Sequence, residues 1–146
     1  MANRQMDGAL RSFVKERCFI DMRATIGAAG AITLDAVNSI GILSVTRNSA
    51  GNWTVQFGYA GNINITETYT RLLNINWVFN TLAVGANTPS TVAQIAVASN
   101  TVNTNGQIVL LLTGPTATAN TAQVAADPAN GEIAHIGFQL ANSGAV

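Results

Sequence analysis

Alternation of apolar and polar residues is clearest between Tyr69 and Thr81. One side of the alternation consists of large apolar residues, Leu73, Ile75, Trp77 and Phe79. The other side carries asparagines, at positions 74, 76 and 80. A period of two is the spacing of a β-strand with one buried face. The run therefore predicts a strand whose apolar side, aromatic rings included, points into a core.

A β-hairpin is predicted from Ile42 to Gly58, where two alternating runs flank a loop of Asn, Ser, Ala and Gly. Asn48 and Gly51 tolerate the left-handed backbone that a tight reversal needs. We expect an exposed tip at Asn48–Asn52. The positions expected in the core are Leu43, Val45, Trp53, Val55 and Phe57.

Shorter strands are predicted on both sides of these two features. The run from Phe13 to Ile26 fits strand spacing throughout and helical spacing in its first part, so we expect a strand from about Arg17 and leave a short helix before it open. After a break at Gly27–Ala31, Thr33–Ile40 is expected to form a connection or a short strand. The remaining predicted strands are Thr91–Ala98, Gln107–Thr113, a weak one at Thr121–Ala125, and Glu132–Ala141. The turn signals are Asn103–Gly106, Gly114–Thr116 and Asp127–Gly131.

Seven or eight short strands with regular turns, and no convincing long amphipathic helix, predict an all-β fold. The length of 146 residues suits one domain. We expect a single antiparallel β-sandwich or jelly-roll-like domain over residues 13–146, preceded by an N-terminal arm at residues 1–12. The pattern does not predict the order of the strands in their sheets.

Charge is sparse and is concentrated near the N-terminus. Seven basic and seven acidic residues cancel, and charged residues make up only 10% of the chain, against about 25% in a typical soluble protein. Eight of the charged residues precede Ala24. A free monomer with so uncharged a body would have little electrostatic protection against self-association, whereas a subunit of a larger assembly needs less. Composition therefore favours a multimer over a lone soluble enzyme.

Residues that carry catalytic or metal chemistry are few and scattered. His135 is the only histidine, on the side of its strand opposite Ile136 and Phe138, which is typical of a solvent-facing or interface residue. Cys18 sits among apolar neighbours and is expected to be a buried, inert thiol. Neither residue has a recognisable nucleophile, base or ligand partner in the sequence. We therefore expect no enzyme activity, no metal and no cofactor.

The cellular site is predicted from two further features of the chain. A single cysteine cannot form an internal disulfide, so nothing indicates a protein built for an oxidising compartment. The N-terminus lacks a signal-peptide pattern, and asparagines interrupt the most apolar stretch, Leu72–Gly85. We expect synthesis in the cytosol and no contact with a membrane.

The first 23 residues form a charged head with a net charge of +2, from five basic and three acidic residues. The head is either a solvated face or an arm that docks onto another protein. Nucleic acid is a poor fit, because no basic pattern interleaved with aromatic residues is present. The candidate docking residues are Arg4, Arg11, Lys15, Arg17 and Arg23.

The run GAAGAITLDAVNSIGILSVTRNSAGNWTVQFG, Gly27–Gly58, resembles small virion structural proteins of tailed bacteriophages, in which a GAAGAPTLD…S.GI.SVTRNSAG.YT run recurs. Arg71-Leu72-Leu73 and DPANGEIAHIGFQLANS, Asp127–Ser143, resemble later parts of the same pattern. The chain departs from that pattern at Ile32, where proline is usual, and at Trp53, where tyrosine is usual. Neither change alters the alternation of the strands.

The resemblance implies a β-rich accessory protein of the virion, a head-decoration or cement protein that binds the major capsid protein on the capsid surface. Such a protein is made in the host cytoplasm and commonly acts as a homo-oligomer, for which we expect a trimer. The charged head would then dock onto the capsid or a sister subunit. A tail or head fibre that recognises a host surface glycan stays open as an alternative. Its candidate binding loops are Asn48–Asn52, Asn100–Gly106 and Gly114–Asn130.

Overall fold

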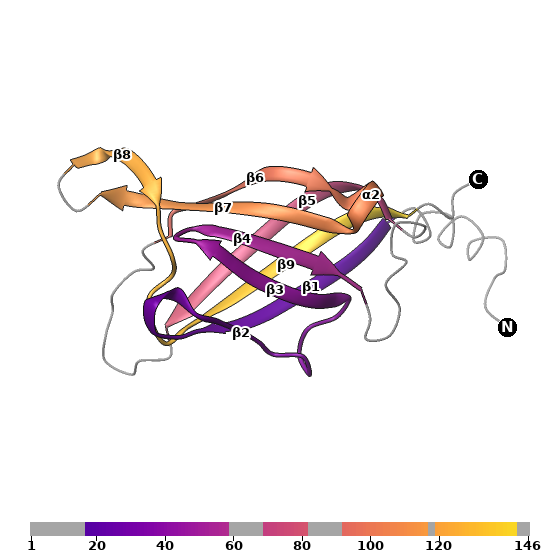
Figure 1. Ribbon diagram of the computed structural model, residues 1–146, viewed down its shortest axis with the longest axis horizontal. Helices are drawn as coiled ribbons and strands as arrows, with labels where there is room; N and C mark the ends of the chain where they lie inside the picture. The colour runs from indigo at the N-terminus through magenta and orange to yellow at the C-terminus, as the bar shows by residue number, and fades with distance from the viewer. Residues whose placement is uncertain (1–16, 59–68, 82–91, 117–118, 143–146) are drawn as a thin grey trace, which may run out of the picture.

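The computed structural model of the protein describes residues 17–58, 69–81, 92–116 and 119–142. Two antiparallel sheets pack face to face in these residues, and their strands cross at an angle in Figure 1. The predicted all-β sandwich is therefore confirmed. The predicted arm at residues 1–12 lies outside the described residues.

The first sheet joins the two ends of the described chain. Its strand order is β2 (Ile32–Leu34), β1 (Arg17–Ile26), β9 (Glu132–Asn142) and β5 (Tyr69–Thr81). The last strand, β9, lies between β1 and β5, with Arg17 opposite Ala141 and Tyr69 opposite Asn142. The predicted start of β1 and both predicted bounds of β5 are confirmed. From here on, the outer face of this sheet is the one turned away from the second sheet.

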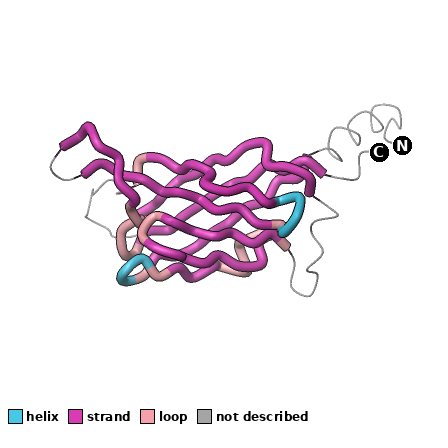
Figure 2. The backbone as a smooth tube through the Cα atoms, turned by 45° about the horizontal axis from the view of Figure 1, so that its top comes forward, coloured by secondary structure: helices cyan, strands magenta, loops and turns pink. Residues whose placement is uncertain are grey.

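The second sheet contains the predicted hairpin. Its order is β3 (Ile42–Ser49), β4 (Asn52–Phe57), β7 (Gln107–Thr116) and β6 (Gln94–Thr101), and β8 (Ala119–Ala125) pairs with β7. The end of β7 and β8 project beyond the sandwich (Figure 2). The turn predicted at Gly114–Thr116 is wrong, because these residues extend β7 against β8. Pro115 is tolerated there because it sits beside an irregularity in the ladder, where a proline can be accommodated.

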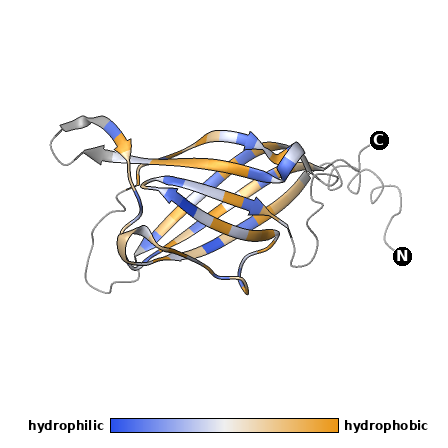
Figure 3. Cartoon of the chain, in the orientation of Figure 1, coloured by the Kyte–Doolittle hydropathy of each residue, from blue (hydrophilic) through white to orange (hydrophobic). Residues whose placement is uncertain are grey.

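Apolar side chains from both sheets meet in one core. The strands alternate hydrophobic and hydrophilic residues along their length (Figure 3). Phe57 of β4 and Phe138 of β9 join the sheets through an edge-to-face contact, with ring centroids 5.2 Å apart and planes at 76°. Other large side chains that are almost fully buried are Ile20, Met22, Ile26, Trp53, Ile108, Leu110, Leu112, Ile136 and Leu140.

Leu43 corrects the predicted core of the hairpin. The register of β3 against β4 shifts between Ile42 and Ser44, so Leu43 is one extra residue, a β-bulge. The bulge reverses the alternation, and Ile42 instead of Leu43 lies opposite buried Phe57. Leu43 is 37% exposed. The other expected core residues of the hairpin are buried, except for Val45, which is half-buried and packs against the core.

A second bulge corrects the predicted core of β5. The register against β9 shifts between Leu72 and Asn74, which leaves Leu73 as the extra residue, 38% exposed. Trp77 lies opposite buried Ile136 but remains 36% exposed, because β5 is the last strand of its sheet in the described structure. Ile75 and Phe79 are half-buried and pack against the core, as predicted.

The hairpin tip is narrower and more enclosed than predicted. Ser49 pairs with Asn52, so only Ala50 and Gly51 make the reversal. Gly51 is buried: its N–H donates to Asp127 over 2.9 Å, and its carbonyl accepts from the Leu112 N–H over 2.6 Å. The prediction of an exposed tip at Asn48–Asn52 is therefore wrong for Gly51, because the chain before β9 packs over it.

Replacement of Gly51 by alanine should lower the free energy of unfolding by about 2 kcal/mol. Its φ is +64°, and an added Cβ would contact the Leu112 carbonyl and lie 2.6 Å from the Ala126 nitrogen. Gly131 is the matched control, since its φ is +87° but an added Cβ meets nothing within 4 Å. Gly131→Ala should therefore cost only the backbone strain, about 1 kcal/mol. Urea unfolding measures both, and equal losses would show that the packing over Gly51 is unimportant.

The short helical elements replace two predicted breaks. The turn predicted at Asn103–Gly106 is a single helical turn, α2 (Val102–Asn105), which ends at Gly106 with a left-handed φ of 62°. The break at Gly27–Ala31 contains a 3-10 turn, η1 (Ala28–Gly30). Val102 anchors α2 in the core, where it is fully buried. Both elements therefore act as connections between strands.

Candidate functional site

The five cations predicted to dock onto a partner are not gathered into one cluster by the described structure. Arg4, Arg11 and Lys15 lie outside the described residues, and only the backbone of Arg17, at the start of β1, is described. Arg23 lies on the outer face of the first sheet, where its Nη1 is 3.2 Å from the Asp35 Oδ2. The charge of Arg23 is thus already paired.

The segment after β2 holds this ion pair against the edge of β1. The Asn38 side chain donates to the Asp35 carboxylate over 2.8 Å and, with the charge of Arg23, lowers the pKa of Asp35. The Arg23 backbone N–H donates to the Ser39 Oγ over 2.9 Å. These contacts cover part of the edge of β1 that β2 does not pair.

Phe19 is the most exposed aromatic residue that the structure describes. It lies on the outer face of β1, 70% exposed, two residues after the point at which residues 1–16 join the strand. Phe19 pairs with Gln139, and Gln139 pairs with Asn74, so these three residues form one row across the sheet. Leu73, which is also exposed, directly precedes Asn74. The sequence does signal Phe19, which stands on the opposite side of the alternation from core residues Ile20 and Met22. Aromatic residues are enriched at the core of protein interfaces, which makes Phe19 a candidate contact residue.

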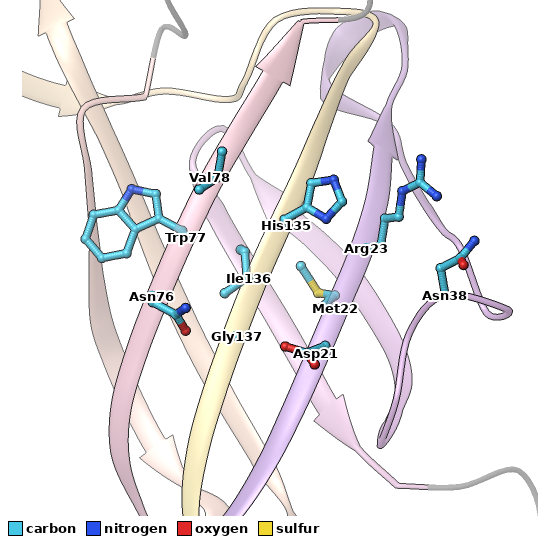
Figure 4. Close-up of a pocket in the computed structure, with 10 residues that line it drawn as sticks. All are labelled: Asp21, Met22, Arg23, Asn38, Asn76, Trp77, Val78, His135, Ile136 and Gly137. Carbon is cyan, nitrogen blue, oxygen red and sulfur yellow. The ribbon is translucent and has the colours of Figure 1, made fainter.

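A hollow of about 170 Å³ lies in the middle of the same outer face. Gly137 of β9 leaves the gap, because its neighbours in the register are Asp21 of β1 and Asn76 of β5. The next row places His135 of β9 between Arg23 and Val78. Figure 4 shows these side chains around Gly137, with Asn38 at one side.

Polar side chains of the hollow have hydrogen-bonding capacity to spare. No side-chain hydrogen bond joins Asp21, Asn76 or His135 to any other residue in the described part of the chain. Asn76 lies over Gly137, where an added Cβ would contact its Oδ1. Val78, 56% exposed, supplies an apolar patch beside His135. The hollow can therefore donate and accept hydrogen bonds and also contact an apolar group.

His135 lies where the sequence predicts it, half-buried on the outer face. No serine, threonine, cysteine or lysine is among the residues that line the hollow with it. A nucleophile for it to activate is therefore missing from this lining. The Trp77 ring lies on the far side of β5 from β9 in Figure 4, so it does not form a stacking platform over the hollow.

A second polar cluster lies between the hairpin and the loop before β9. The Arg47 Nη2 and Nε donate to the Asp127 Oδ2 over 2.8 and 3.0 Å. The other carboxylate oxygen of Asp127 accepts from the Gly51 N–H and, over 3.4 Å, from the Trp53 indole. Burial alone raises the pKa of Asp127, but the hydrogen bonds from Arg47, Gly51 and Trp53 outweigh it, so the pKa is lowered.

This cluster joins three segments that are far apart in the sequence. An added Cβ at Gly30, in the GAAGA segment, would lie 2.5 Å from the Asp127 Oδ2 and 2.7 Å from the Arg47 Nε. Gly30 also has a left-handed φ of 75°. The motif SVTRNSAG contributes Arg47 and Gly51, and DPANG contributes Asp127. Because both carboxylate oxygens of Asp127 accept hydrogen bonds within the protein, we assign the cluster a structural role.

The three loops considered for glycan binding do not form one surface. Asn52 at the β3–β4 turn pairs with Leu111, whereas Gln56 at the other end of β4 pairs with Gln107. Asn100–Gly106 therefore lies at the opposite end of the sheet from Asn48–Asn52. The described part of Gly114–Asn130 approaches the hairpin tip, because the Ala126 N–H donates to the Leu112 carbonyl and the Ala126 nitrogen lies beside Gly51. A glycan site shared by all three loops is excluded by this topology.

Other candidate chemistry is limited in the described residues. No group of three or more His, Cys, Asp or Glu residues there is placed to hold a metal ion. No helix among them is long and apolar enough to cross a membrane. Cys18 is half-buried and packs against the core. It is more exposed than predicted, because it lies next to Arg17 at the start of β1.

Sequence reasoning identified His135 and Arg23 but not the residues that surround them.

In comparisons with known proteins, no family model, no curated protein and no solved structure matches this chain.

Proposed function

We propose that this protein is a structural component of a tailed-phage virion, a decoration protein that binds the major capsid protein and stabilises the capsid lattice. The observation that carries the proposal is Phe19, an aromatic ring 70% exposed at the end of the sheet where residues 1–16 join β1. An aromatic side chain that becomes buried on binding is a typical anchor of a protein-binding hot spot. The resemblance of Gly27–Gly58 to phage virion proteins supplies the class of partner.

The remainder of the described surface fits a protein with a structural role. Arg23 and Asp35 form one ion pair, Arg47 and Asp127 form another, and Asn, Thr, Gln and Ser are frequent among the exposed strand residues. A contact of modest area at one end of the sandwich, repeated over a lattice, gives large avidity without a tight single contact. We propose a homotrimer as the bound form.

Deletion of Met1–Leu10 should lower occupancy on capsids by about tenfold at limiting protein concentration, because the deletion removes Arg4 and shortens the arm. Capsids assembled without this protein are mixed with the full or shortened chain, sedimented, and analysed for bound copies. The deletion ends before β1, so the thermal midpoint of the sandwich should stay unchanged and serves as the folding control. Equal occupancy and equal capsid stability with both chains would show that the arm does not contribute to capsid binding.

A further inference from the structure

The hollow around Gly137 has no part in the proposed capsid contact. It lies one row beyond Phe19 along the sheet, since Phe19 pairs with Gln139 and Asp21 pairs with Gly137. An end-on contact through the arm and Phe19 leaves this row facing solvent. A ligand for the hollow is therefore a separate question from capsid binding.

Charges at the hollow disfavour an anionic ligand. Asp21 and Arg23 supply one full charge of each sign, two residues apart on β1. Asp35 already occupies Arg23 at 3.2 Å, so an anionic ligand would face the Asp21 carboxylate without a free cation to offset it. A neutral ligand can use the Asp21 carboxylate as a hydrogen-bond acceptor and needs no partner of opposite charge. A metal ion lacks ligands here, because no group of three suitable side chains is present in the described residues.

Donors and acceptors at the hollow match vicinal hydroxyl groups. The Asp21 carboxylate only accepts, the Asn76 amide both donates and accepts, and the His135 ring offers a donor or an acceptor. A hydroxyl group also donates and accepts, so neighbouring hydroxyls on a ring can bond to a carboxylate and an amide at once. Val78 lies beside His135 and can contact the C–H groups of the same ring.

The size of the hollow limits the ligand to one ring. A volume of about 170 Å³ holds a single hexose but not an oligosaccharide chain. We infer that the hollow binds one neutral hexose, either free or as a residue of a surface glycan. Asp21 and Asn76 bond to its hydroxyl groups, with Gly137 as the floor between them.

Titration of the full, ¹⁵N-labelled chain with methyl glycosides of glucose, galactose, mannose and N-acetylglucosamine tests this assignment. At least one should shift the amide signals of Asn76, Gly137 and His135, with a Kd of about 1 mM, as expected for so small a ligand in an open site. Glucuronic acid, which adds a carboxylate, should bind more weakly than glucose. Binding to a bead that carries a glycan ending in the same sugar distinguishes a hexose that is part of a surface glycan from a free hexose.

Asn76→Ala should weaken the binding about tenfold through the loss of hydrogen bonds to the ring. Asn74→Ala is the matched control: Asn74 lies on the same strand and the same face, opposite Gln139, outside the hollow. Gly137→Ala should weaken binding similarly, because its Cβ displaces the flexible Asn76 side chain without straining β9. Unchanged thermal midpoints establish that all three variants fold.

The assignment is overturned if none of the four glycosides shifts these amides, or if Asn74→Ala weakens binding as much as Asn76→Ala. It is also overturned if the major capsid protein, and no sugar, protects the hollow, which would make the hollow part of the protein contact. Capsid occupancy is measured separately. A failure of the sugar site therefore leaves the proposed decoration function standing, and the reverse also holds.

Discussion

Replacement of Asp127 by alanine lowers the free energy of unfolding by about 3 kcal/mol, the largest loss expected here from a single polar side chain. The change removes both hydrogen bonds from Arg47, the bond from the Gly51 N–H and the bond from the Trp53 indole. It also leaves the guanidinium of Arg47 without its partner in a partly buried place. Urea unfolding of the variant, followed by tryptophan fluorescence, measures the loss.

Asp35→Ala is the matched control, because it breaks the other ion pair of the described structure. The side chains of Arg23 and Asp35 are 35% and 29% exposed, against 15% for Asp127, so solvent screens their interaction more strongly. We therefore expect a clearly smaller loss than for Asp127→Ala. Equal losses for the two aspartates would show that Asp127 does not hold the hairpin to the loop before β9.

The contribution of Asp127 should disappear in acid. Its pKa in the folded protein lies below the ordinary value of 3.8, because its hydrogen bonds outweigh the opposing effect of burial. The unfolded chain therefore takes up a proton first as the pH falls, and the stabilisation is complete above the ordinary value and lost through the folded pKa. Asp127→Asn should lack this component. The difference in stability between the wild type and the asparagine variant should shrink below pH 3.8, and a constant difference would contradict the assignment.

Phe19→Asp should weaken capsid binding about 30-fold, because a charge replaces the aromatic anchor of the proposed contact. The ring is 70% exposed, so the free energy of unfolding should change by less than about 0.5 kcal/mol. Co-sedimentation with capsids that lack the protein measures the affinity, and urea unfolding measures the stability.

Val124→Asp is the matched control for Phe19→Asp. Val124 is 45% exposed on β8, in the hairpin that projects from the other sheet, so the substitution adds the same charge on a different sheet from Phe19. Full binding by this variant together with weak binding by Phe19→Asp locates the contact. Equal weakening of both variants would attribute the effect to net charge and would remove Phe19 from the contact.

Strand existence was predictable because alternation is a local property of the chain. Tyr69–Thr81 has the same bounds in the structure as in the prediction, and β1 begins at the predicted Arg17. Leu43 and Leu73 could not be placed in the same way, because each is an extra residue in a bulge and reverses the alternation that follows. A bulge depends on the pairing partner, which local alternation does not reveal.

The candidate site was predictable only in part, because it depends on register between distant strands. The outward side of His135 follows from its alternation with Ile136, but its neighbours Arg23 and Val78 come from strands far away in the sequence. Arg47 and Asp127 are 80 residues apart and have no shared local pattern. The one signal in the sequence is that few charged residues occur in the body of the chain. An unpaired, partly buried charge is costly, so each of these residues is expected to have a partner.

Cryo-electron microscopy of the purified phage particle tests the decoration function most directly. We expect density for the sandwich on the outside of the capsid shell, in groups of three copies. The start of β1, with Arg17 and Phe19, should face the major capsid protein. Density confined to the tail, or a purified particle that does not contain the protein, would contradict it.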